Sequence, residues 1–530
     1  MPPLHPDAIS FARRCTQHAI NTPNREAIVL IDEHDAELCI TWRELDTRAR
    51  QLACQLRARG AGIQSLVVIA LPTGAEHFVA ALAAWRLGAC VLPVSPDMPP
   101  LERDKILKVI RTWRTPIMIG NWEAKDISTI ALESFDDLIG SSLDSLDDAM
   151  PCPGKAIGSG GSTGTPKIIV DPKPWAHVPG SWGALSRVGL RPSQVQLVLG
   201  SLYHNVGFMC GHIGLFEGHT LIIPKRFNAG QAVGLIERHR VQFAGLIPIM
   251  MQRIAKLPHA NALQFPSVEG LYHSGGACPE WVKRMWLNMV RPERLWELYG
   301  STEDTGITMI SGDEWFARPG SVGRPYRTDI VILDADKRPL PSGTVGEIHM
   351  RHTTLGATFI GETWPSHPGF LYIGAPPPDV IADGFVSIGD LGWLDDDGYL
   401  YLADRRVDMI KSGGINVYPA EVEGALSEHP EIQDAVVIGV PDPEWGYRVH
   451  ALVQPTQWPP VLTAAGLDSF CRERLTAHKA PKSYELVQSL PRDASGKIRR
   501  SAIREDRQAG RFLGILLSAS PQSSAHRDST

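Results

Sequence analysis

The chain has 530 residues, and its 52 basic and 58 acidic side chains leave a formal net charge of −6. This balance argues against a dedicated nucleic-acid binder, whose surface would be basic. A composition of 43% hydrophobic and 21% charged residues is globular and excludes a chain that is disordered throughout. At roughly 150 residues per domain, the length allows three or four compact units.

The eight cysteines are irregularly spaced and none forms a CxxC pair, which argues against a zinc ribbon, an iron–sulfur cluster or a disulfide framework. No uncharged apolar run reaches the roughly 18 residues that a membrane helix needs. The first residues also lack the apolar core of a signal peptide. We therefore expect a soluble enzyme of the reducing cytoplasm.

The N-terminal third alternates helix and strand patterns. Thr41 and Glu44 form a capping box, so a helix is expected to begin there. Residues 66–71 form an apolar run typical of a buried strand, and residues 75–87 follow as a second helix. The pattern recurs within residues 220–250. This alternation predicts an α/β protein with a parallel sheet.

The clearest motif combines glycines, hydroxyl residues and a lysine: Ser159, Gly160, Gly161, Ser162, Thr163, Gly164, Thr165, Pro166 and Lys167. Glycines let the backbone present N–H groups to an anion, and the lysine adds charge, so the run suits phosphates. It is not a Walker A loop, because Pro166 leads into a strand-like segment instead of a helix. Its glycines and serines alone would also fit an ordinary surface loop.

Four weaker motifs follow. Residues 299–303 (YGSTE) offer an aromatic ring for a base, hydroxyls for phosphate, and a carboxylate for Mg²⁺, although the string also fits a strand that ends in a turn. Residues 387–393 place Asp390 where it could accept both ribose hydroxyls or serve as a turn aspartate. Residues 404–414 and a loop containing Lys497 complete the set. The segment after residue 403 predicts a small α+β unit, with a helix from residue 419 and strands at 435–440 and 450–455.

In this order, the five motifs resemble the adenylate-forming (AMP-binding) superfamily, which includes acyl-CoA and aryl-CoA synthetases, adenylation domains of peptide synthetases, and luciferases. The resemblance covers residues 25–505 and is strongest to fatty-acid, bile-acid and aryl-CoA ligases. It implies an α/β fold with a large multi-sheet N-terminal domain (1–403), a small mobile α+β C-terminal domain (404–510) and a flexible tail (511–530).

The resemblance also implies a reaction. ATP and Mg²⁺ would activate a small carboxylic acid to an acyl-adenylate, and the acyl group would pass to the thiol of CoA. An acceptor other than CoA, such as a carrier protein or an amine, is the alternative. A catalytically silent nucleotide-binding relative is a third possibility, against which the intact Lys167, Glu303, Asp390 and Lys497 count. No nucleic-acid partner and no stable membrane insertion are expected, and the protein would be a monomer or homodimer.

The nucleotide-binding residues implied by the resemblance come from five short segments: Ser159, Gly160, Gly161, Ser162, Thr163, Gly164, Lys167, Ser274, Gly275, Gly276, Tyr299, Gly300, Ser301, Thr302, Asp390 and Arg405. The glycine-rich run would hold the β- and γ-phosphates. Tyr299 would pack on adenine beside the turn at 274–277, and Thr302 would contact phosphate. Asp390, assisted by Arg405, would bind the ribose hydroxyls.

Three residues are expected to carry the chemistry: Lys497, His204 and Glu303. Lys497 would stabilise the charge that develops between the carboxylate and the α-phosphate. Glu303 would hold Mg²⁺. His204 would lie beside the acid carboxylate, although a satisfied core histidine is its alternative role.

The CoA side is expected in the C-terminal domain. Gly413 and Gly414 would line the pantetheine tunnel, and Trp445 and Lys482 would contact the CoA nucleotide. Two residues depart from the family pattern, since Ala480 replaces an arginine of some relatives and Val407 replaces a polar hinge residue. Two glycines, Gly211 and Gly214, suggest open room near His204, but they do not separate fatty, steroid and aromatic acids.

Overall fold

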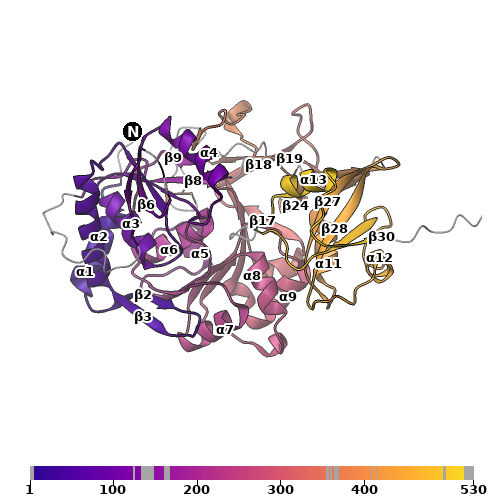
Figure 1. Ribbon diagram of the computed structural model, residues 1–530, viewed down its shortest axis with the longest axis horizontal. Coiled ribbons are helices and arrows are strands. Elements are labelled where there is room, and N and C mark those ends of the chain that lie inside the picture. The colour runs from indigo at the N-terminus through magenta and orange to yellow at the C-terminus, as the bar shows by residue number, and fades with distance from the viewer. Residues whose placement is uncertain are drawn as a thin grey trace, which may run out of the picture.

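The computed structural model describes residues 5–122, 124, 126–132, 148–159, 167–353, 357–358, 361–362, 369–405, 408–413, 415–492 and 497–518. Figure 1 shows two parts, a large N-terminal unit and a smaller C-terminal unit that begins after the strand labelled β24. No described helix is long and apolar enough to cross a membrane.

The first sheet of the large unit has seven strands in the order β22-β9-β8-β5-β4-β6-β7. Their bounds are β4 (Ser65–Ala70), β5 (Cys90–Pro93), β6 (Thr115–Gly120), β7 (Ser128–Ile130), β8 (Lys155–Ser159), β9 (Lys167–Asp171) and β22 (Leu371–Ile373). Strand β4 pairs in parallel with β5 and β6, as the alternating pattern predicted. Every residue of β4 is buried, which explains its uninterrupted apolar sequence.

The second sheet has thirteen strands in the order β18-β19-β23-β24-β17-β16-β15-β14-β13-β11-β12-β2-β3. Its central strands, from β2 through β12, β11, β13 and β14 to β15, are parallel. The bounds are β2 (Glu26–Ile31), β3 (Glu37–Thr41), β11 (Val195–Val198), β12 (Thr220–Pro224), β13 (Phe243–Leu246), β14 (Gly270–His273), β15 (Leu295–Gly300), β16 (Ile307–Ser311), β17 (Ser321–Pro325), β18 (Thr328–Leu333), β19 (Gly346–His352), β23 (Asp390–Leu394) and β24 (Leu400–Arg405).

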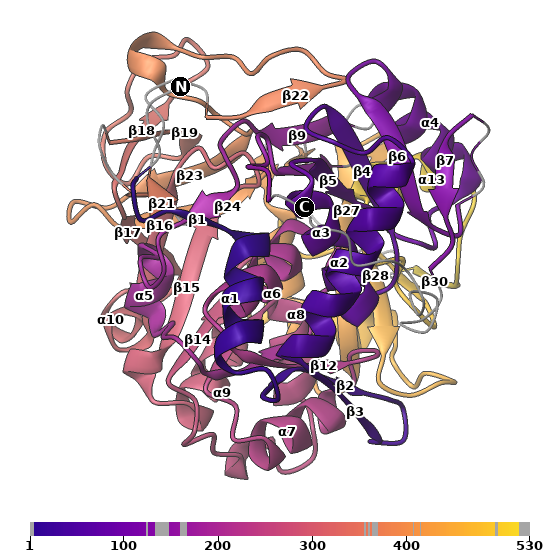
Figure 2. The same ribbon diagram turned by 90° about the vertical axis from the view of Figure 1, so that its left-hand side faces the viewer.

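Helices fill the space between and around these sheets. Figure 2 shows α1, α2, α3 and α6 side by side between the two groups of strands. Helix α2 begins at the predicted capping box, in which the Thr41 hydroxyl accepts from the Glu44 N–H and the Glu44 carboxylate accepts from the Thr41 N–H. The helices of the large unit are α1 (Phe11–Asn21), α2 (Trp42–Ala58), α3 (Ala75–Arg86), α4 (Pro100–Arg111), α5 (Ala184–Val188), α6 (Asn205–Phe216), α7 (Ala229–Arg238), α8 (Pro248–Ala255), α9 (Glu280–Met289) and α10 (Gly312–Ala317).

Two small two-stranded pairs complete the large unit: β1 (Ile9–Ser10) with β10 (Ala176–His177), and β20 (Ala357–Thr358) with β21 (Gly361–Glu362). One apolar core joins the inward faces of α1, α2, α3 and α6 to the first sheet and to one face of the second. A second core lies on the opposite face of the second sheet, under α7, α8 and α9. The carboxyl ends of the parallel strands are therefore held by packing on both faces.

The C-terminal unit has one sheet in the order β26-β25-β28-β29-β30, with β27 paired to β28. Its elements are β25 (Ile410–Ser412), β26 (Ile415–Val417), α11 (Pro419–Ser427), β27 (Ile432–Asp442), β28 (Gly446–Pro455), α12 (Ala464–Arg472), β29 (Ser483–Leu486), α13 (Arg500–Gln508) and β30 (Ile515–Ser518). The predicted helix from 419 and the strands at 435–440 and 450–455 are present. A flexible tail was expected from residue 511, but residues 515–518 of that segment form strand β30, which pairs with every residue of β29.

Candidate active site

The glycine-rich run connects two paired strands. Strands β8 and β9 are antiparallel, and Ser159 is the register partner of Lys167. Residues between them, including Gly160, Gly161, Ser162, Thr163 and Gly164, lie outside the described part of the chain, as does the side chain of Ser159. Lys167 begins β9, so Pro166 leads into a strand, as the sequence indicated. Strands β8 and β9 thus form an antiparallel hairpin whose second strand begins at Lys167.

Lys167 and Glu303 form an ion pair at the base of this hairpin. The Lys167 Nζ lies 3.0 Å from the Glu303 Oε1 and donates at 3.0 Å to the Tyr372 hydroxyl, which itself donates to the same carboxylate oxygen at 2.9 Å. The Nζ also lies 4.1 Å from the centre of the Tyr372 ring. Burial, and then the Glu303 carboxylate, raise the pKa of Tyr372, so its hydroxyl stays protonated. Tyr372 was missed by the sequence analysis, since no local motif marks it.

The Glu303 carboxylate fits the hard oxygen ligand that Mg²⁺ prefers. The residue is 7% exposed, and its second carboxylate oxygen makes no hydrogen bond to the described residues. Among the described residues, no group of three or more His, Cys, Asp and Glu side chains is gathered as a metal site. Glu303 therefore offers a single carboxylate beside a lysine, an arrangement suited to a metal that is also bound by phosphate.

A second ion pair lies directly beside the first. The Lys173 Nζ is 3.2 Å from the Asp304 Oδ2, and the His352 Nε2 is 3.5 Å from the Asp304 Oδ1. Burial alone would raise the pKa of Asp304, but Lys173 and His352 outweigh burial and hold that pKa below its usual range. Asp304 has a backbone φ of 51°, in the left-handed region. This pair fixes the turn that follows Glu303, and sequence reasoning did not find it.

Two residues expected at the adenosine are in direct contact. The Tyr299 hydroxyl donates to the Asp390 Oδ2 at 2.9 Å, although the two residues are 91 positions apart. Asp390 begins β23 after a turn in which Gly389 has a φ of +87° and donates its N–H to the Ser387 hydroxyl. Arg405 is the register partner of Asp390 in β24, and its side chain is outside the described residues.

The turn at 274–276 leaves the sheet beside Tyr299. Ser274, Gly275 and Gly276 follow β14, which pairs in parallel with β15, the strand that carries Tyr299 and Gly300. Gly275 has a φ of +87°, a conformation that glycine adopts without strain. Ser301 and Thr302 continue from β15 toward Glu303 and are half-buried. The carboxyl ends of neighbouring strands thus gather the motif residues at one edge.

His204 lies at the start of α6, on the same edge. It is the N-cap residue of that helix, in extended conformation, and is half-buried with its ring 4.8 Å from the Tyr203 ring. Val206, in the first turn, is near the 274–276 turn, because a Cβ built on Gly275 would lie 4.0 Å from a Val206 methyl. The first turn of α6, which His204 caps, therefore lies close to the turn at 274–276.

The expectation that Gly211 and Gly214 leave open room was wrong. A Cβ on Gly211 would lie 2.9 Å from Phe78, and one on Gly214 would lie 2.2 Å from the Gln196 side-chain oxygen. Both positions are filled by neighbouring side chains. The glycines allow α6 to pack closely on α3 and β11 and do not create a cavity.

Three of the residues expected to contact CoA lie close together in the C-terminal unit. Gly413 has a φ of +57°, donates its N–H to the Trp445 carbonyl at 2.9 Å, and is so close to the Trp445 ring that a Cβ would approach it to 2.8 Å. The Lys482 Nζ lies 5.4 Å from the centre of the same ring. Burial, followed by the charge of Arg472, lowers the pKa of Lys482. Gly414 is outside the described residues.

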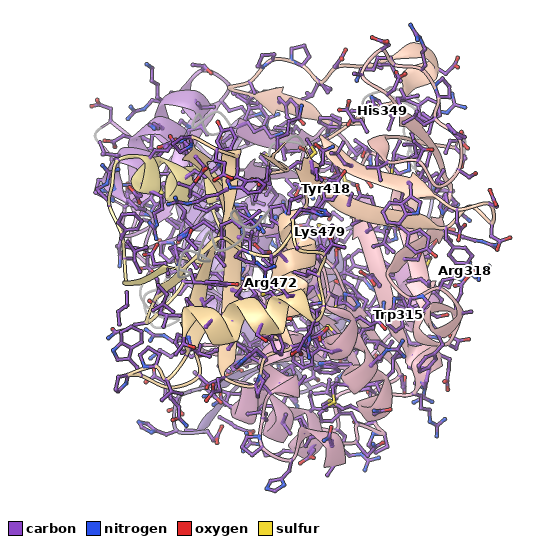
Figure 3. All side chains as sticks on the ribbon, turned by 90° about the vertical axis from the view of Figure 1, so that its right-hand side faces the viewer. Trp315, Arg318, His349, Tyr418, Arg472 and Lys479 are labelled. Atoms are coloured by element: carbon purple, nitrogen blue, oxygen red, sulfur yellow. The ribbon has the colours of Figure 1, made fainter. Side chains whose placement is uncertain are left out.

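Lys497 is exposed and follows the undescribed residues 493–496. Two residues later, Arg499 forms an ion pair with Glu102 in the first turn of α4, which ties this segment to the large unit. Figure 3 is drawn from the side of the C-terminal unit and labels Arg472 at the end of α12, together with Tyr418 and Lys479 of the same unit.

The two units meet through a few further contacts. The Trp281 indole N–H donates to the Ser427 hydroxyl at 2.9 Å, and the Gln252 amide donates to the Gln433 carbonyl at 3.1 Å. The Lys256 amine donates to the Ile432 carbonyl. Helices α8 and α9 thus contact α11 and the start of β27.

Known proteins resemble this chain over nearly its whole length. A 2-succinylbenzoate–CoA ligase of Bacillus licheniformis is 29% identical over 91% of this chain and 97% of that protein. The structure of the o-succinylbenzoate CoA synthetase (MenE) of Bacillus subtilis in complex with its acyl-adenylate intermediate is 25% identical, covers 94% of this chain and 98% of that one, and superposes with a TM-score of 0.75. A double mutant of the same synthetase bound to a product analogue covers the same shares at 25% identity, with a TM-score of 0.61.

The family comparison covers both units. The AMP-binding enzyme family matches residues 15–114 and 157–359, which include the end of β8, all of β9 and the Tyr299–Glu303 segment. The C-terminal domain of AMP-binding enzymes matches residues 421–497, ending at the expected lysine. This chain therefore belongs to the AMP-binding enzyme family.

Proposed function

We propose that the protein is an AMP-forming acid–CoA ligase. It converts a carboxylic acid and ATP to an acyl-adenylate and pyrophosphate, and then transfers the acyl group to the thiol of CoA. The observation that carries the proposal is that residues from three distant parts of the chain form two contacting pairs. These pairs are Lys167 with Glu303 and Tyr299 with Asp390. The nearly full-length similarity to a CoA ligase supports the same reaction.

The residues at the hairpin bind the polyphosphate of ATP in this proposal. The Lys167 ammonium and the backbone of the hairpin meet the phosphates, and Glu303 supplies a ligand to Mg²⁺. When bound, the metal offsets phosphate charge and orients the pyrophosphate leaving group. Lys167 shares a carboxylate oxygen with Tyr372, so its amine is already directed toward the metal ligand.

The adenosine and the acid occupy the adjoining edge. Asp390 binds the ribose hydroxyls, with the Tyr299 hydroxyl holding one of its oxygens in place, and the Tyr299 ring packs on adenine beside Gly275. The acid carboxylate lies near His204 and attacks the α-phosphorus of ATP. Lys497 stabilises the negative charge that develops between the two groups.

The arrangement of the two units fits the first half-reaction. The chain is nearer to the synthetase that holds an acyl-adenylate than to the same synthetase with a product analogue bound, by TM-scores of 0.75 and 0.61. The Arg499–Glu102 pair keeps the Lys497 segment against the large unit. We propose that the unit after residue 403 then rotates and brings Gly413, Trp445 and Lys482 to the thiol entrance.

The setting of the enzyme is part of the same proposal. All eight cysteines are free thiols, as is usual in a reducing compartment, and we propose the cytoplasm as its location. The proposed partners are the acid and CoA, with the protein acting as a monomer or homodimer.

Acid-dependent exchange between ATP and labelled pyrophosphate tests the proposal. A panel of fatty, steroid and aromatic acids is assayed with and without CoA. We expect exchange with at least one acid and conversion to its CoA thioester when CoA is added. Exchange without any thioester would assign a different acceptor, and no exchange with any acid would contradict the adenylation itself.

A further inference from the structure

A buried lysine lies behind the acid side of the site. Lys155 is 6% exposed and stands on β8, four residues before Ser159. Its Nζ donates to the Asn205 side-chain oxygen at 2.9 Å and lies 3.5 Å from the Met209 sulfur. It forms no ion pair with any described carboxylate. Burying an amine with one good acceptor is costly, and only the Trp175 ring, 5.8 Å from the Nζ, adds a further favourable contact among the described residues.

The lysine fixes which way the Asn205 amide faces. An ammonium group has donors and no acceptor, so it can bind only the oxygen of the amide. The Asn205 NH₂ group is then directed away from Lys155. That nitrogen makes no hydrogen bond with any described residue, and it is not among the fully buried unpaired side-chain atoms, so it is reachable from solvent. The pair presents a free donor at a fixed orientation.

The donor is presented at the acid end of the site. Asn205 directly follows His204 and is the first residue of α6. Its side chain is half-buried, whereas every residue of α6 from Gly207 onward is buried. No side chain caps the first turn of α6, so its positive end adds to the Lys155 charge. Val206, next in the chain, faces the turn at Gly275. The region beside His204 is therefore electropositive and rich in donors.

We propose that Asn205 determines substrate specificity by donating a hydrogen bond from its NH₂ group to a second oxygen of the acid substrate, and that Lys155 is the positioning residue for this amide. The inference rests on the proposed ligase activity. The substrate class is carboxylic acids that carry an acceptor oxygen (ether, keto, hydroxyl or a second carboxylate) within a few bonds of the reacting carboxyl. An apolar acid of the same shape leaves the amide unpaired and is disfavoured.

Matched acid pairs test the proposal in the full-length enzyme. The pairs are 2-methoxybenzoate with 2-ethylbenzoate, and 4-oxopentanoate with 4-methylpentanoate, assayed by pyrophosphate exchange. We expect the wild-type kcat/KM to favour the oxygen-bearing member of at least one pair by about tenfold or more. Asn205→Leu should remove that preference, chiefly through KM. Lys155→Met should reduce it several-fold, because the amide can then turn over.

Asn205→Asp is the control that separates specificity from folding. The aspartate still accepts from Lys155, so we expect a thermal stability at or above that of the wild type. It lacks the NH₂ donor, so the preference for the oxygen-bearing acids should disappear. A purely structural role for the pair predicts an unchanged preference in this variant.

Equal use of the two members of each pair by the wild type would overturn this inference alone, because adenylation would still occur. A preference that survives both Asn205→Leu and Asn205→Asp would also overturn it. Absence of exchange with every acid would overturn the proposed function and this inference together.

Discussion

The nucleotide end of the large unit and its contact with the C-terminal unit are held together by different forces. At the nucleotide end, the partly buried ion pairs Lys167–Glu303 and Lys173–Asp304 hold the segment after β15 against β9 and the residues that follow it. At the contact between units, the bonds from Trp281 and Gln252 are made to neutral acceptors, and the Arg499–Glu102 ion pair is largely exposed on its arginine side. Removing one partner of a fully buried ion pair costs about 3–5 kcal/mol and an exposed ion pair contributes about 0–1 kcal/mol, so a partly buried pair lies between these limits, whereas a neutral hydrogen bond contributes about 1 kcal/mol.

This difference separates a fixed part from a movable part. The charged residues proposed to meet phosphate and metal are held in place without ATP, which is what electrostatic catalysis requires. The weaker contacts of the C-terminal unit suit the rotation that we propose for the second half-reaction.

The largest effect is expected at Glu303. Glu303→Gln keeps the shape of the side chain but replaces a carboxylate with a neutral amide, a poor ligand for a hard divalent ion. We expect acid-dependent pyrophosphate exchange to fall by about 10²-fold or more, with the loss partly recovered at high Mg²⁺. Tyr372→Phe is the matched control, because it removes one hydrogen bond to the same carboxylate and should cost only a few-fold. A folded Glu303→Gln enzyme with near-normal exchange would remove Glu303 from the metal site.

A smaller and selective effect is expected in the C-terminal unit. Lys482→Met removes the cation beside the Trp445 ring without disturbing the fold of β29. We expect thioester formation from preformed acyl-adenylate to slow about tenfold through a higher KM for CoA, with exchange unchanged. Arg318→Met, which removes a half-buried cation paired with Asp397 in the large unit, should change neither rate. A loss of exchange equal to the loss of thioester formation would argue against a CoA role for Lys482.

The smallest effect is expected at the contact between the units. Burial lowers the pKa of Lys256 from 10.5 to about 8, while Asp434 acts in the opposite direction. Between pH 8 and 10.5 the unfolded chain binds this proton and the folded protein does not, so stability rises with pH in that window. The melting temperature of the wild type, relative to Lys256→Met, should therefore rise by about 1–2 °C between pH 7 and 9.5. A difference that stays constant with pH would show that Lys256 keeps its ordinary pKa.

Local patterns were enough for the main elements and for several neighbouring site residues. The capping box at Thr41 and the strand after Pro166 follow from short motifs with a physical cause. Only the family resemblance implied that Tyr299 and Asp390 share one site, and their direct contact was not predicted. The roles assigned to these residues remain predictions. Tyr372, Lys173 and His352 could not be found, because each is a single residue brought in by sheet pairing over long sequence separations.

Small residues and chain ends were the other source of error. A glycine in a helix pattern is compatible with open space or with a close neighbour, and only the fold places Phe78 and Gln196 against α6. The strand Ile515–Ser518 was missed because its partner β29 is needed to complete it. No motif marked Lys155 either. Its proposed role depends on its hydrogen bond to the Asn205 side chain, which joins β8 to the start of α6.

Lys497→Ala, assayed in both half-reactions, tests most directly the claim that one mobile unit serves two separate steps. The variant is measured from acid plus ATP, and again from preformed acyl-adenylate plus CoA. We predict a loss on the order of 10²–10³ in the first rate, as for removal of one preorganised charge, and a change of no more than a few-fold in the second. Equal losses in the two rates, or an unchanged first rate, would contradict the account.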